Sequence, residues 1–309
     1  MSSTVSNVIA PHPRPWSIRG LRRLAPVVAV VLGVGLTACA PPSNPGASET
    51  SPESSPSAPA TTAGDVVAWA SGAEWSFAPD GLQTPFPVAF TDGAAVDDSG
   101  RTYELGDGVE ADADGDGVID VAIPVTQHDG NGVLRLWYVW LGVDRPGEGE
   151  PAAEQVVYPI ARMSRCGDVV NDVAAVDGGY RIDQVLRLPF DTTDCASGGT
   201  GQQVREVHVE RIDGVAYPIQ TAPIPAWGGV CPRSEWMDGL IDEEVDARAA
   251  PPASAPQVIA PGEAVSLYEL PDAPLLTADG TRFFGFQTEE IMAHGSTTSD
   301  KLTHCAFAG

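Results

Sequence analysis

The chain has very little positive charge. It contains one lysine, Lys301, and 17 basic residues in all against 42 acidic ones, a formal net charge of −25. Binding to nucleic acid requires clustered lysine and arginine, so this composition argues against nucleic acid as a partner. Anionic lipid headgroups would also be repelled, whereas divalent cations or a neutral or basic partner suit the surface. The alternative is that the acidity only keeps the protein soluble.

Familiar catalytic motifs are also missing. None of the histidines lies in an HExxH or HxxEH sequence, and neither GxSxG nor SxxK occurs. The cysteines form no CxxC pair, which disfavours a zinc site. The sequence therefore identifies no catalytic residue, and a non-enzymatic protein is favoured.

A long apolar run is absent as well. The apolar stretch Leu24–Ala38 has 15 residues, and a membrane-spanning helix needs about 20. Four arginines and no acidic residue precede it, and it ends in the sequence LTAC, Leu36–Cys39. This arrangement predicts a cleaved signal peptide over residues 1–38, with export favoured through the general secretory route.

The LTAC sequence resembles the lipobox of bacterial lipoproteins. The resemblance implies cleavage before Cys39, a diacylglyceryl group on its thiol and a further acyl chain, such as palmitate, on the new amine. Two or three acyl chains hold a protein on a membrane. The alternative is an ordinary secretory signal with a chance cysteine. Either way the mature chain keeps 13 basic and 42 acidic residues, a net charge of −29, and the folded part is extracytoplasmic.

Residues 39–65 are rich in proline, serine, alanine and threonine and have almost nothing to bury. This composition predicts a disordered tether that spans about 28 Å or more. The four cysteines beyond it, an even number in an exported chain, predict two disulfides. Three pairings are possible, and we favour Cys166–Cys195 with Cys231–Cys305 because these respect the domain division below.

Asp-Gly pairs between alternating apolar segments recur along the rest of the chain and predict β-hairpins. We expect hairpins around residues 128–132, 177–179 and 213–214, and another near 279–280. Helices are expected for residues 235–250 and 289–294. A proline-rich break at 222–229 suggests an antiparallel β domain over 66–221 and a smaller, disulfide-bonded α+β domain over 230–309; the fold class is mainly β.

The sequence EADADGDGVIDVAI, residues 110–123, concentrates acidic residues around two glycines. Counted from Asp112, carboxylates occupy positions 1, 3, 5 and 9, which is the spacing of a calcium loop. Ile123 stands where an EF-hand requires glutamate. The segment resembles the calcium loops of FG-GAP/VCBS repeats, in which the loop joins two strands of one propeller blade. A single copy argues against a propeller.

The FG-GAP resemblance implies Ca²⁺ with a structural role. It names as ligands the side chains of Asp112, Asp114, Asp116 and Asp120 and the carbonyl of Val118. The alternative is a solvated acidic turn without an ion.

We expect a cell-envelope lipoprotein, anchored in the membrane through Cys39, that binds an envelope protein or glycan or has a structural role. A hydrolase with an unrecognised carboxylate pair is a second hypothesis. A solute-binding subunit of a transporter is a third, disfavoured because alternating β and α units are not seen.

Overall fold

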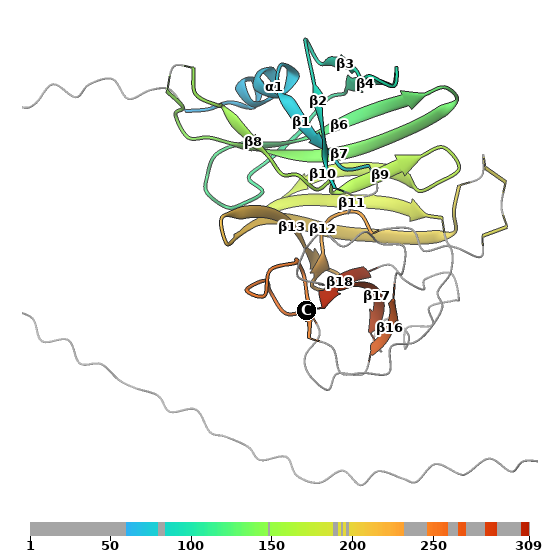
Figure 1. Ribbon diagram of the computed structural model, residues 1–309. Coiled ribbons are helices and arrows are strands. Elements are labelled where there is room, and N and C mark those ends of the chain that lie inside the picture. Colours follow the sequence, from blue (N-terminus) through green and yellow to red (C-terminus); the bar gives the residue numbers. More distant parts are fainter. Residues whose placement is uncertain are drawn as a thin grey trace, which may run out of the picture. The chain divides into compact units, whose positions relative to one another are not determined.

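The structure is a computed structural model. It describes residues 60–79, 84–147, 149–187, 191–192, 194–195, 198–231, 246–258, 265–269, 282–288 and 304–308. The predicted signal peptide, Cys39 and most of the predicted tether lie outside these ranges. No helix within them is long and apolar enough to cross a membrane. The described part is mainly β, with antiparallel sheets, as predicted (Figure 1).

The described part begins with a helix that the sequence analysis missed, α1 (Ala63–Ser71). Thr62 caps it: its hydroxyl accepts a hydrogen bond from the Asp65 N–H, and the Asp65 carboxylate accepts one from the Thr62 N–H at 2.9 Å. This capping box satisfies two backbone donors at the start of the helix. The helix thus includes residues that we expected in the tether.

A short hairpin, β1 (Glu74–Phe77) with β2 (Phe86–Ala89), follows α1. The next strands form a sheet in the order β3-β4-β6-β7-β8, with β5 paired to β6 and β9 paired to β7. We call it the first sheet. Its strands are β3 (Ala94–Val96), β4 (Thr102–Leu105), β5 (Val109–Ala111), β6 (Asp120–Asp129), β7 (Gly132–Gly142), β8 (Ala153–Gln155) and β9 (Ala161–Ser164).

The second sheet has the order β10-β11-β12-β13-β14. Its strands are β10 (Val169–Val176), β11 (Gly179–Leu186), β12 (Gly201–Ile212), β13 (Val215–Ala222) and β14 (Ala226–Trp227). The predicted hairpins are confirmed by the registers Asp129↔Gly132, Val176↔Gly179 and Ile212↔Val215. The fourth is only partly described: Arg282–Thr288 is a strand, and residues 279–280 lie outside the described ranges.

The first sheet is covered on both faces. One face of β6 and β7 packs under α1 and the β1–β2 hairpin, in a cluster that includes Trp75, Ile123 and Trp140. The other face packs against the second sheet, where Trp137 and Leu141 lie with Tyr180 and other side chains. Trp137 and Trp140 of β7 lie on opposite faces of the strand, and both are buried because each face has a cover.

A third cluster joins the second sheet to the C-terminal region, and Trp227, Cys305 and Phe307 belong to it. The C-terminal sheet has the order β15-β18-β17-β16; its strands are β15 (Ala247–Arg248), β16 (Val265–Glu269), β17 (Arg282–Thr288) and β18 (His304–Ala308).

The disulfides are Cys166–Cys195 and Cys231–Cys305, the two favoured pairs. The boundary at 222–229 stays a prediction, but β14 lies inside it and pairs with β13.

The helices expected after residue 230 fall largely outside the described residues. At the end of the first one, the structure differs from the expectation: Ala247 and Arg248 form a strand that pairs with β18. Two prolines follow at 251 and 252, and a residue before proline is biased away from the helical region. Strand pairing and burial of Ala247 therefore prevail over the helical spacing.

Candidate metal site

The acidic loop of residues 112–119 connects two paired strands, β5 and β6, which meet at Ala111↔Asp120. Gly115 and Gly117 have φ angles of 76° and 85°, in the left-handed region that favours glycine. The loop therefore reverses the chain within a few residues, at the positions where the sequence has glycine.

Three of the predicted ligands lie together. Carboxylate oxygens of Asp112, Asp114 and Asp116 are all within 4.8 Å of one another, and the side chains are half-buried or exposed. Burial and the neighbouring Asp116 raise the pKa of Asp114. Like charges at this spacing repel one another, and a divalent cation between them would remove that repulsion.

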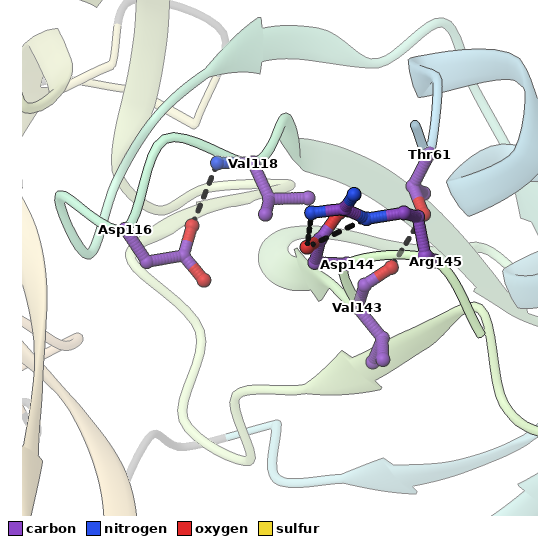
Figure 2. A network of polar contacts seen from close by, with 6 residues as sticks. All are labelled: Thr61, Asp116, Val118, Val143, Asp144 and Arg145. Atoms are coloured by element: carbon purple, nitrogen blue, oxygen red, sulfur yellow. Dashed lines mark hydrogen bonds and ion pairs between the residues drawn. The ribbon is translucent and has the colours of Figure 1, made fainter. Parts of the chain in front are cut away.

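The carboxylates also organise the loop backbone. Asp112 accepts hydrogen bonds from the N–H groups of Gly115 at 2.9 Å and Gly117 at 3.1 Å. Asp116 accepts one from the Val118 N–H at 2.7 Å (Figure 2). A carboxylate has about four lone-pair sites, so these bonds leave oxygen sites for a metal.

Asp120 does not belong to this group of three. Its side chain is 1% exposed, and its two oxygens accept hydrogen bonds from the Ala113 N–H at 2.7 Å and the Gly142 N–H at 2.9 Å. Burial raises its pKa to about 7, against the opposing effect of these two hydrogen bonds. Asp120 joins the start of the loop to the end of β7.

The end of the loop rests against the end of β7. A Cβ atom on Gly142 would lie 2.3 Å from the Ile119 carbonyl oxygen and 2.9 Å from a Val118 methyl, so only glycine permits this approach. The chain after β7 continues through Val143, whose carbonyl accepts a hydrogen bond from the Thr61 hydroxyl (Figure 2). No described contact tests the Val118 carbonyl as a ligand, and that role stays a prediction.

The start of the loop contacts the second sheet. The Ala113 carbonyl accepts a hydrogen bond from the Val209 N–H of β12 at 2.7 Å, and Ala113 is 1% exposed. On the same strand, Arg211 forms a bidentate ion pair with Glu154 of β8, at 2.8 and 3.2 Å. Arg211 is close enough to Asp114 to oppose the rise in its pKa. The acidic loop therefore lies where the two sheets meet.

Sequence reasoning missed a second polar site, on the inner face of the second sheet. Gln203 and Arg205 are buried, and they share the face of β12 that carries Val207 and Val209. Alternation predicts apolar residues at such positions. The signal that could have revealed this site is the presence of Gln203 and Arg205 at positions of β12 where the alternation predicts apolar residues.

Comparison with known proteins found no family model, no curated protein and no solved structure that matches this chain.

Proposed function

We propose that this protein is an exported, lipid-anchored envelope module, non-enzymatic, whose acidic loop binds calcium as a structural link. The observation that carries the calcium proposal is the convergence of Asp112, Asp114 and Asp116 within 4.8 Å. Calcium takes six to eight oxygen ligands, and carboxylates and backbone carbonyls are typical donors. The Val118 carbonyl and water are the further ligands that we propose; Asp120, whose two oxygens accept backbone hydrogen bonds, instead supports the loop.

The position of the loop supports a structural role for the ion. Ala113, between two of the clustered aspartates, is hydrogen-bonded to β12 of the second sheet, and Asp120 at the end of the loop holds the end of β7. An ion that orders the loop would therefore also hold the junction between the sheets. Extracellular calcium sites of this kind have dissociation constants of about 10⁻⁴–10⁻³ M.

The anchoring proposal rests on the lipobox resemblance at Leu36–Cys39. Acyl chains on Cys39 would hold the module at the membrane surface, where it would bind an envelope protein or a glycan. A Cys39→Ser variant should then move from the membrane fraction to the soluble exported fraction. Membrane attachment equal to that of the wild type would contradict the proposal, and labelling with radioactive palmitate provides an independent readout.

Calcium binding can be measured directly by titration calorimetry on the purified chain. We expect saturable binding, and in 10 mM calcium a rise in Tm of about 5–10 °C relative to EGTA if the dissociation constant is about 10⁻⁴ M. Asp114→Asn/Asp116→Asn should lose both effects, because it removes two of the three clustered charges without changing side-chain volume.

Arg211→Gln should bind calcium a few-fold more tightly, because it removes a nearby positive charge.

The matched control is Asp98→Asn/Asp107→Asn, which removes the same charge from two exposed residues outside the acidic loop. It should keep the calcium-dependent Tm. If neither the wild type nor the control binds calcium, the loop is a solvated acidic turn. If the control loses binding as fully as the loop variant, the effect comes from net charge and not from the cluster.

A further inference from the structure

A small polar cavity lies at the second sheet, away from the acidic loop. It has a volume of about 40 Å³. Its polar side chains are Arg162, Asp168, Gln184, Gln203, Arg205 and Gln220. A water molecule needs about 10–15 Å³ of such volume, so the cavity has room for a few waters or for one small ion.

Arg205 is the unusual member of this lining. Its side chain is 4% exposed, and its guanidinium donates to the carbonyls of Gly228, at 2.7 Å, and Ile160. Among the residues that the structure describes, none accepts a hydrogen bond from its Nε–H and no carboxylate forms an ion pair with it. Burial lowers its pKa to about 10, so it is charged at neutral pH. A buried charge without a counter-charge is costly.

The other charged side chains described in the cavity lining, Arg162 and Asp168, balance one another. Asp168 accepts hydrogen bonds from Arg162, at 3.1 Å, and from the Arg187 N–H, at 2.8 Å. Beside the lining, His304 forms a hydrogen bond with Gln220, and burial and the positive charge of Arg205 lower its pKa to about 3, so it is neutral. The remaining polar side chains described in the lining are glutamine amides. Among the described lining residues, the charge of Arg205 is therefore the one left uncompensated.

We propose that this cavity binds one small monovalent inorganic anion, of the size of chloride, as the counter-ion of Arg205. One negative charge balances the lining, and an ion of this size suits a volume of about 40 Å³. Water would satisfy the free Nε–H but would leave the charge in place. Phosphate and sulfate are larger and carry more charge than the lining can balance. The anion would be part of the folded structure and would stabilise the second sheet.

The test is the thermal unfolding of the full chain at constant ionic strength, with chloride replaced stepwise by gluconate, which is too large for the cavity. Above the dissociation constant, each tenfold rise in chloride should raise the Tm by about 3–5 °C. Arg205→Met should lose this dependence. The control, Arg181→Met, removes a positive charge from an exposed position on β11 of the same sheet and should keep it.

A second measurement uses the wild-type chain alone, so it holds even where Arg205→Met does not fold. Crystals grown with bromide in place of chloride should show an anomalous peak in the cavity within hydrogen-bond distance of Arg205 Nε. An empty or water-filled cavity in that map, with a Tm that is independent of chloride, overturns the proposal. Equal chloride dependence in the wild type and in folded Arg205→Met overturns it too, because the effect would then arise elsewhere.

Discussion

Replacing Asp120 by alanine should lower the free energy of unfolding by about 2–6 kcal/mol, measured by urea unfolding in EGTA. The carboxylate accepts hydrogen bonds from the Ala113 and Gly142 N–H groups, and its side chain is 1% exposed. Alanine would leave two backbone donors without their acceptor, each at a cost of about 1–3 kcal/mol. The loss should appear without calcium, because these hydrogen bonds belong to the fold and not to the metal.

Asp112→Ala is the matched control for this prediction. Asp112 also accepts two backbone N–H bonds, but from Gly115 and Gly117, which are exposed. Water can replace those bonds, so we expect a loss below about 1 kcal/mol in EGTA. Calcium binding should show the opposite order: Asp112→Ala should weaken it more than Asp120→Ala, because Asp112 belongs to the carboxylate cluster. Equal losses for the two variants in EGTA would show that Asp120 has no special role in the scaffold.

Removing the Cys231–Cys305 disulfide should have an effect of similar size. The bond closes a loop with a sequence separation of 74, which corresponds to about 4–5 kcal/mol in the chain-entropy model. Cys305 is also buried, in a cluster with Trp227 and Phe307, so Cys231→Ala/Cys305→Ala loses packing as well. We expect a Tm lower by about 8–16 °C or more.

Cys166→Ala/Cys195→Ala provides the comparison. That disulfide has a sequence separation of 29, about 3.5 kcal/mol in the same model, and both cysteines are exposed. Removing this disulfide should therefore lower the Tm by less than removing Cys231–Cys305. A larger loss for Cys166→Ala/Cys195→Ala would mean that packing alone keeps β18 and Cys305 in the third cluster.

The hairpins were predictable because they depend on local features, whereas the favoured disulfide pairs followed from the proposed division of the chain into two domains. An Asp-Gly pair between alternating segments specifies a tight turn, and the turn sets the register of its two strands. The capping box of α1 is also a local signal, formed by Thr62 and Asp65, but the proline- and serine-rich composition around it favours a tether.

The candidate metal site was predictable in part. Spacing along a tight loop brings Asp112, Asp114 and Asp116 together, because alternate residues around two glycines face the same side. The same spacing grouped Asp120 with them. The structure instead buries Asp120, because its position is fixed by β6 and by the end of β7, a partner 22 residues away. A long-range contact of this kind has no signature in the loop.

What the sequence by itself determined is the mainly β class, the turns and the grouping of three carboxylates, since each depends on residues close along the chain. The tertiary structure alone decided which faces are covered. It buries both tryptophans of β7, places the acidic loop at the junction of two sheets and encloses Arg205 beside a cavity. The physical reason is that burial depends on what packs against a strand, and residue periodicity within that strand does not contain this information.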